Sequence, residues 1–327
     1  MHNESPKCQL LQFPKIEDER GNLSFLEAGK QLPFELARAY WIYDVPGGEK
    51  HGGHAYHNQE ECLIALSGSF DVRVRSDRGE ELYSLNRSYK GLHLPAGNWR
   101  SLENFSTNAL ALVLSSGVYD PAEYIRDFAE LEQSRADAKS GKLFQEELKP
   151  ADLNPAAMFS ATTKQTKSKL TTSEQAILKL SAYDDLPGKN IFTVQDCRLL
   201  ELPTHHDREG NLTAVNGERE LPFALKRLYY VYDIPYGSQR GGHAHKELKQ
   251  WVIAASSCFD VLLDDGQEQK RFRLDRPNLA LEIPAGIWRE ISGFASGAVA
   301  LVLASAEFSE ADYIRDYEQF LDFRSCN

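Results

Sequence analysis

The sequence has few cysteines and no long apolar run, and these absences exclude whole classes of protein. Its five cysteines show no C-x-x-C spacing, so neither a disulfide framework nor a zinc ribbon is predicted. No apolar stretch is long enough to cross a bilayer, and residues 1–20 have no basic region followed by an apolar one. We therefore expect a protein of the cytoplasm.

Positive charge is also scarce. The chain carries a formal net charge of -11, whereas nucleic acids and anionic membranes are bound by clusters of lysine and arginine. We expect neither partner, although local arginines can still bind a small anionic ligand. With 42% hydrophobic residues among 327, the chain has enough apolar material for about two packed domains of roughly 150 residues each.

The two halves of the chain repeat each other at a constant separation of 189 residues. The matching segments are 32–34 with 221–223, 52–55 with 241–244, 94–97 with 283–286, and 124–127 with 313–316. Because the match is ungapped over about 120 residues, the loops have equal lengths, and a duplicated domain of one fold is predicted. We place the domains at residues 1–135 and 191–327, joined by a linker at 136–190. Residues 129–149 read as helix, and residues 162–172 as a polar connection.

Each copy consists of short runs of β-forming residues separated by glycine, proline, asparagine and aspartate. In the first copy these runs lie at residues 39–45, 61–66, 70–75 and 109–114. Many short strands are typical of a sandwich or barrel, so an all-β fold is predicted. A helix start follows at residues 120–123 and, more weakly, at 309–312. We expect the Tyr-Ile-Arg-Asp run behind each start to serve helix packing.

A paired-histidine motif stands out in the second copy. Gly-Gly-His-Ala-His at residues 241–245 lies between two predicted strands, and His243 and His245 point to the same face because they are two residues apart. Imidazole is a common metal ligand and a common acid or base near neutral pH. The pair therefore indicates a metal site or a proton-transfer site, with the alternative that both rings are satisfied polar residues of a barrel.

The motif resembles the metal site of cupin barrels, in which H-x-H is followed by a glutamate and later by a third histidine. In the second copy the glutamate position holds Gln250 and the later histidine position holds Arg289. Two positions of the first copy are likewise changed, to Tyr56 and Arg100. A guanidinium at a ligand position repels a divalent cation, so we predict chemistry without a metal.

Four segments of the second copy, at residues 226–230, 240–246, 284–290 and 312–315, resemble the sugar-nucleotide 3,4-ketoisomerases of the WxcM-like cupin family. The resemblance covers nearly all of both copies and implies two tandem cupin, or jelly-roll, barrels. It also implies a substrate, a dTDP-linked 4-keto-6-deoxy sugar such as dTDP-4-keto-6-deoxyglucose, and no cofactor. In that reaction a base removes the proton from C3, an enediol forms, and a proton returns to C4.

The resemblance implies roles for individual side chains of the second copy. His243 and His245 would be the catalytic pair, with Tyr229 hydrogen-bonded to one of them; which histidine takes the proton stays open. Arg227 and Arg240 would face the pyrophosphate or the sugar oxygens through their planar guanidinium groups, unless they are charges of the barrel rim.

Two neighbouring positions of the second copy are further candidates for substrate contacts. Arg289 is one of them. Trp288 is the other, and its ring would flank the thymine or the sugar, with the alternative that it packs at the barrel mouth.

The two copies depart from the family pattern in complementary ways. The first copy keeps a diverged site made of His54, Tyr56, Tyr40, Arg38 and Arg100. The second copy has Glu209 where the early D-x-R-G-x-L motif of the first has Arg20. We hypothesise that the early strands are exchanged between barrels, which pair within the chain or in a homodimer. Arg20 would then complete the site around the two histidines.

Three other functions stay open at this point. A 3,5-epimerase of the same pathway is also a cupin-like barrel with a histidine base. A non-catalytic protein that binds or scaffolds sugar nucleotides is favoured by Tyr56 and Glu209, and opposed by the intact histidine pair. A metal-dependent dioxygenase is disfavoured by the incomplete ligand set described above.

Overall fold

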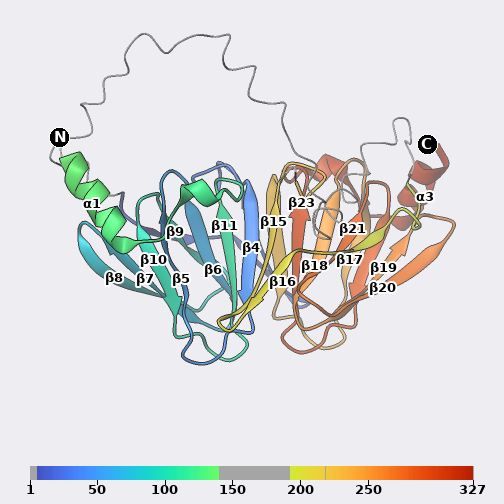
Figure 1. Ribbon diagram of the computed structural model, residues 1–327. Helices are drawn as coiled ribbons and strands as arrows, with labels where there is room; N and C mark the ends of the chain where they lie inside the picture. The colour runs from blue at the N-terminus through green and yellow to red at the C-terminus, as the bar shows by residue number, and fades with distance from the viewer. Residues whose placement is uncertain (1–5, 140–191, 218, 327) are drawn as a thin grey trace, which may run out of the picture.

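The computed structural model describes residues 6–139, 192–217 and 219–326 (Figure 1). Two β-barrels lie side by side. The first half of the chain ends in the helix α1 (Phe128–Lys139), and the second half ends in the helix α3 (Tyr317–Cys326). This confirms the predicted all-β fold of two tandem barrels with short C-terminal helices. The predicted linker beyond residue 139 lies outside the described residues, and the domain boundaries stay predictions. No described helix is long and apolar enough to cross a membrane.

Each half of the chain contributes twelve strands in the same order. The strands of the first half are β1 (Gln9–Gln12), β2 (Lys15–Asp18), β3 (Gly21–Glu27), β4 (Arg38–Tyr43), β5 (His51–Tyr56), β6 (Glu61–Ser67), β7 (Phe70–Ser76), β8 (Gly79–Leu85), β9 (Lys90–Leu94), β10 (Trp99–Glu103), β11 (Leu110–Ser115) and β12 (Tyr124–Ile125). The strands of the second half are β13 (Arg198–Glu201), β14 (Thr204–Asp207), β15 (Gly210–Asn216), β16 (Arg227–Tyr232), β17 (Arg240–His245), β18 (Gln250–Ser256), β19 (Phe259–Asp264), β20 (Gln269–Leu274), β21 (Leu279–Ile283), β22 (Trp288–Ser292), β23 (Val299–Ala304) and β24 (Tyr313–Ile314). We call these halves the first and the second unit.

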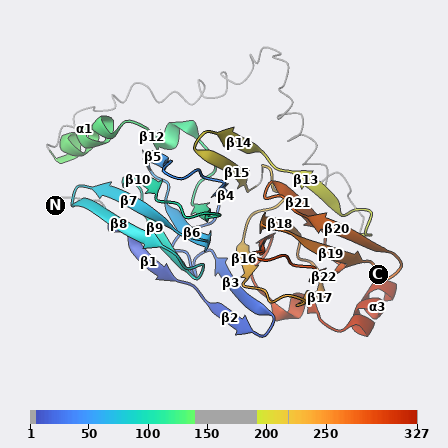
Figure 2. The same cartoon turned by 90° about the horizontal axis from the view of Figure 1, so that it is seen from below.

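Each barrel combines a seven-stranded with a five-stranded sheet, and the larger sheet takes strands from both units. The orders are β1-β9-β6-β11-β4-β15-β14 with β12-β5-β10-β7-β8, and β13-β21-β18-β23-β16-β3-β2 with β20-β19-β22-β17-β24. Strand β3 of the first unit pairs with β16 of the second, and β15 pairs with β4 in return. Figure 2 shows the blue hairpin of β2 and β3 at the edge of the second barrel. The hypothesis of strand exchange is therefore confirmed, and the exchange takes place within one chain.

A glycine at the turn of each exchanged hairpin lets it lie close to the other unit. Gly21 has φ +108°, and a Cβ atom on it would come within 2.9 Å of the backbone oxygen of Asp233. Gly210, its counterpart, has φ +125° and would meet the oxygen of Tyr43 at 3.0 Å. Since any larger residue would be strained and would collide with backbone, the glycine of the D-x-x-G segments has a structural reason in both units.

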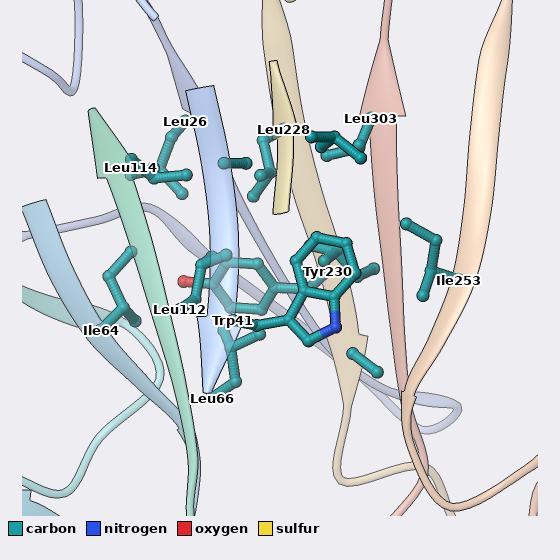
Figure 3. Packing of buried hydrophobic residues seen from close by; sticks show 14 of the residues in the cluster. Leu26, Trp41, Ile64, Leu66, Leu112, Leu114, Leu228, Tyr230, Ile253 and Leu303 are labelled. Atoms are coloured by element: carbon teal, nitrogen blue, oxygen red, sulfur yellow. The ribbon is translucent and has the colours of Figure 1, made fainter. Parts of the chain in front are cut away.

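One apolar core joins the two units. Trp41, Leu112, Leu228 and Tyr230 are all fully buried in it and come from both halves (Figure 3). The indole nitrogen of Trp41 donates to the carbonyl of Pro277 in the other unit at 2.9 Å. Burying one large apolar side chain contributes about 1.5–3 kcal/mol, so this shared core fixes the barrels against each other and positions the exchanged hairpins.

The Tyr-Ile-Arg-Asp runs have the predicted role only in part. Asp120 caps a single 3-10 turn by accepting from the backbone of Ala122 at 2.9 Å, so the predicted cap is present. The chain then becomes extended, and β12 and β24 pair with β5 and β17. The isoleucine of each run packs against the helix that follows it, as expected. The run itself is an extended strand at an open sheet edge, and the α-helices begin only afterwards.

Candidate active site

The second barrel contains a cavity of about 510 Å³ that is lined by both units. Its walls include six residues named from the sequence: Arg20, Arg227, Tyr229, Arg240, His243 and Arg289. Strand β3 adds Leu23 and Phe25 to the lining, beside the strands of the second unit. Arg20 thus lies in the same cavity as His243, although 223 positions separate them in the sequence.

A larger cavity of about 720 Å³ lies elsewhere, where turns of the two units meet. It is lined largely by turn segments, among them residues 86–89 and 294–299. None of its described lining residues is a histidine. We place the candidate site in the smaller cavity because titratable side chains converge there.

Two glycines bring His243 to the wall of this cavity. Gly241 and Gly242 both have positive φ, at +86° and +67°, and the pairing of β17 with β22 shifts register between Gly241 and His243. A Cβ atom on Gly241 would lie 2.6 Å from the carbonyl oxygen of Arg289. Such a bulge turns the following side chain out of the regular alternation, which explains why a glycine pair precedes the histidine.

The cavity is cationic within an acidic protein. Its lining has six basic side chains, Arg20, Lys30, Arg227, Arg240, Arg289 and Arg315, and two acidic ones, Asp18 and Glu27. Asp18 accepts from Arg20 at 2.8 Å and from Arg240 at 3.1 Å, and the Arg20 guanidinium lowers the pKa of Asp18 to about 2. Buried donors of Arg227 and Arg240 lack a partner in the structure. Guanidinium groups with free donors are suited to a phosphate or pyrophosphate ligand.

His245 lies behind the cavity wall and has both ring nitrogens bonded to protein. Its side chain is 2% exposed. Its Nδ1 lies 2.7 Å from the carboxylate of Asp312, and its Nε2 lies 2.9 Å from the amide nitrogen of Gln250. Burial and the charge of Arg289 lower the pKa of His245 to about 3, against the opposing effect of Asp312. The ring is therefore neutral at pH 7, donates from Nδ1 and accepts at Nε2.

His243 faces the cavity and is held by an arginine. Its Nε2 accepts from Nη2 of Arg289 at 2.6 Å. Burial, followed by the charge of Arg289, lowers the pKa of His243 far below its usual value of 6.5. The ring of Tyr313 lies against both histidines, with centroid distances of 5.0 and 4.2 Å. A neutral imidazole at a cavity wall is in the form required of a general base.

Two residues named from the sequence have other neighbours than predicted. Tyr229 was expected to bond a histidine, but its hydroxyl interacts with Arg289, and its ring lies under the Arg227 guanidinium at 5.3 Å. Trp288 is not among the residues that line the cavity. Its ring packs on Phe320 of α3 at 5.5 Å, so it occupies the alternative position at the barrel mouth.

A family model described as "FdtA: WxcM-like, C-terminal" matches residues 6–136 and again residues 195–325. The chain belongs to the WxcM-like family. A curated relative, the TDP-4-oxo-6-deoxy-alpha-D-glucose-3,4-oxoisomerase of Aneurinibacillus thermoaerophilus, is 39% identical over 114 residues, which are 35% of this chain and 82% of the relative.

Solved structures of similar proteins each match about two fifths of the chain. One is a 3,4-ketoisomerase from Helicobacter canadensis, which is 42% identical. The match covers 40% of this chain and 98% of that protein, with a TM-score of 0.39. The second is a histidine-to-asparagine variant of the 3,4-ketoisomerase QdtA from Thermoanaerobacterium thermosaccharolyticum, in complex with TDP-4-keto-6-deoxyglucose. It is 33% identical, the match covers 40% of this chain and 96% of QdtA, and the TM-score is 0.40.

The first WxcM-like unit has its diverged site residues in the equivalent place, but they bond to one another. The carboxylate of Glu61 accepts from Tyr40 at 2.5 Å, from Tyr56 at 3.1 Å and from Arg100 at 2.8 Å. His54 packs against the ring of Tyr56 at 5.0 Å. Arg38, the fifth residue of this site, donates to the hydroxyl of Tyr124 at 3.0 Å. Glu61 thus joins Tyr40, Tyr56 and Arg100 into one buried network, whereas Nε of Arg38 and Nε2 of His54 are buried without a hydrogen-bond partner.

Sequence reasoning missed three residues of the second WxcM-like unit that contact the histidines. Tyr313 belongs to the Tyr-Ile-Arg-Asp run, for which helix packing is predicted, and Asp312 belongs to the predicted helix start at residues 309–312. Gln250 had been considered only as a missing metal ligand. For Asp312 and Tyr313 the signal is the segment behind the last long strand, which returns to the edge of β17. Among the described residues, no three His, Cys, Asp or Glu side chains come together in a way that could hold a metal ion.

Proposed function

We propose that this chain is a TDP-sugar 3,4-ketoisomerase whose working site is the cavity of the second WxcM-like unit. The observation that carries the proposal is a neutral His243 at the wall of a cationic cavity that Arg20 of the first unit completes. The names of the relatives supply the reaction and the nucleotide. The proposed substrate is a TDP-linked 4-keto-6-deoxy sugar.

The arginines of the cavity are proposed to hold the diphosphate of this substrate. Arg20, Arg227 and Arg240 are placed on three different strands or turns around one opening, and a diphosphate presents oxygens in several directions at once. Charge-assisted hydrogen bonds to such a group are about twice as strong as neutral ones. Binding would thereby orient the sugar ring toward His243 at the inner wall.

His243 is proposed to be the base. Its Nε2 takes the proton from C3, the electrons of that C–H bond form a C3–C4 double bond, and the C4 carbonyl oxygen becomes an enediolate oxygen. Proton transfer between the two oxygens and return of the proton to C4 leave a carbonyl at C3 and a hydroxyl at C4. The oxidation of C3 balances the reduction of C4, so the reaction needs no external oxidant or reductant.

His245 is proposed to position His243 rather than to take a proton itself. Both of its nitrogens are already bonded, to Asp312 and Gln250, and it is not among the cavity-lining residues. Its ring lies edge-on to that of His243 at 5.2 Å. A ring fixed in one tautomer by two partners gives the base a rigid neighbour, and Tyr313 covers both rings from the other side.

The deciding experiment is to incubate the protein with dTDP-4-keto-6-deoxyglucose in deuterated water and to follow C3 and C4 by NMR. The proposal expects a 3-keto product that carries deuterium at C4, and the loss of this product in His243→Asn. Exchange at C3 and C5 with the carbonyl still at C4 would identify a 3,5-epimerase instead. Binding without any exchange would identify a protein that only binds the sugar nucleotide.

A further inference from the structure

Both units bury an arginine at the same position of the barrel, but the two arginines have different neighbours. Arg100 and Arg289 are separated by the constant 189 positions, and each is 3% exposed. Arg100 is held by the carboxylate of Glu61 through Nε at 2.9 Å and Nη2 at 2.8 Å. The equivalent of Glu61 in the second unit is Gln250, which carries no charge.

Glu61 does more in the first unit than neutralise Arg100. Its carboxylate also accepts from the hydroxyls of Tyr40 and Tyr56, and it is 2% exposed. The guanidinium additionally donates to Tyr40 at 2.7 Å. A buried ion pair is favourable only when further hydrogen bonds satisfy the remaining donors and acceptors, and this one is built in that way. The charge of Arg100 is thereby neutralised within the protein.

Arg289 has no such carboxylate. Gln250 is directed to His245 instead, at 2.9 Å, and the hydrogen-bonding partners of Arg289 are His243 and Tyr229, both uncharged. Arg289 also lines the cavity. A buried cation that has only neutral hydrogen-bonding partners, and on which the charge of Arg227 also acts, is unfavourable in the empty protein. An anion that enters the cavity would compensate it.

The reaction supplies such an anion next to His243. When C3 loses its proton, negative charge develops on the oxygen at C4, and Arg289 is bonded to the nitrogen that takes that proton. A preorganised cation beside a charge that exists only in the transition state and the intermediate accelerates the chemical step. The substrate oxygen would take over the Arg289 donor that His243 accepts in the empty site.

We propose that Gln250 is a positioning residue whose neutrality keeps Arg289 unpaired for the enediolate oxygen, whereas Glu61 closes the first unit by pairing with Arg100. This inference rests on the proposed function. According to it, the working unit differs from the other because a neutral amide, Gln250, stands where the first unit has the carboxylate of Glu61.

The test is to compare Gln250→Glu with the neutral variant Gln250→Met in the full chain. Gln250→Glu is expected to lower kcat about 100-fold, the size of effect seen when a preorganised donor is removed from an oxyanion. The dissociation constant for TDP should change less than about threefold, because the diphosphate contacts of Arg20, Arg227 and Arg240 are untouched. Gln250→Met should lower kcat less than about tenfold. Folding is checked by thermal unfolding, and a carboxylate is already tolerated at the equivalent position of the first unit.

Two further measurements keep the inference separate from the proposed function. A crystal structure of Gln250→Glu should show the new carboxylate on Arg289, in the arrangement of Glu61 on Arg100; a carboxylate that stays on His245 overturns the inference. So does a kcat of Gln250→Met as low as that of Gln250→Glu, or an unchanged kcat in Gln250→Glu. An inactive wild-type chain contradicts the proposed function as well, whereas an active wild type with an equally active Gln250→Glu contradicts the inference alone.

Discussion

The two units of this chain share a fold, loop lengths and several site residues, and they differ in how those residues are satisfied. In the first unit the polar side chains bond to each other around Glu61. In the second, the equivalent arginine Arg289 has only the neutral partners His243 and Tyr229. A buried arginine that is neutralised by a carboxylate needs no ligand, whereas one that has only neutral partners is compensated when an anionic ligand binds. The two units therefore differ in whether a carboxylate neutralises the buried arginine.

The largest difference in activity is expected between variants of the first histidine of each unit, His243 and His54. His243→Asn should lower kcat for the 3,4-ketoisomerisation about 1,000-fold, since it removes the proposed general base. The matched variant His54→Asn should leave kcat within about twofold, because His54 lies in the closed unit. NMR assays of product formation measure both. Equal losses in the two variants would assign catalysis to both barrels.

The next effect separates stability from activity in the first unit. Glu61→Gln removes one partner of a buried ion pair and should lower the free energy of unfolding by about 3 kcal/mol, because Arg100 stays buried without its carboxylate. Turnover at the second unit should not change. Urea unfolding and the NMR assay on the same sample measure the two quantities. A fall in kcat without a loss of stability would contradict the role of Glu61 as a closing group.

A pH dependence of stability should distinguish the units as well. His245 has a pKa of about 3 in the folded protein and an ordinary value of 6.5, so the unfolded chain binds its proton more readily. The stability associated with the neutral ring is present above pH 6.5 and is lost as the pH falls through that value toward 3. Between pH 6.5 and 5.5 this one ring should cost the wild type about 1 kcal/mol.

Urea unfolding of His245→Gln at these two pH values measures that contribution. The variant should lose about 1 kcal/mol less than the wild type between pH 6.5 and 5.5. Tyr56→Phe, at the equivalent position of the first unit, should keep the wild-type dependence, because a phenol does not titrate in this range. An unchanged pH dependence in His245→Gln would mean that the ring titrates normally in the folded chain.

A change in ligand affinity tests the exchange of strands. Arg20→Glu places in the first hairpin the residue that Glu209 provides in the second, and TDP should bind about tenfold more weakly because one exposed cation is replaced by an anion. The effect should diminish at high salt. Glu209→Arg is the matched control and should leave TDP affinity of the second unit unchanged. Isothermal titration at two salt concentrations makes the comparison.

Much of this architecture could be predicted because the repeat is ungapped. The strand runs near residues 61–66 and 70–75 agree with β6 and β7, and equal loop lengths required equal folds. The exchange of hairpins was predicted because each unit lacks a residue that the other has. Tyr56 replaces the second histidine in the first unit, and Glu209 replaces the early arginine in the second. Such a pattern indicates that two distant segments share one site without showing how they meet.

The remaining features depend on tertiary contacts that local sequence does not encode. Asp312 ends a 3-10 turn that has no side-chain cap, and Tyr313 follows it in an extended segment that pairs with the open edge of β17. The hydroxyl of Tyr229 is directed by the unpaired charge of Arg289, which a strand pattern does not reveal. Trp288 is placed by α3, whose packing against the barrel mouth decides on which side of the strand the ring lies.

The exchange of hairpins within one chain has a consequence for mass action. A site that borrows a strand from a separate subunit is lost when dilution separates the subunits. Here the strand that carries Arg20 and the strand that carries His243 are parts of one covalent chain, so their meeting is intramolecular at every protein concentration. The specific activity of this chain should therefore stay constant on dilution.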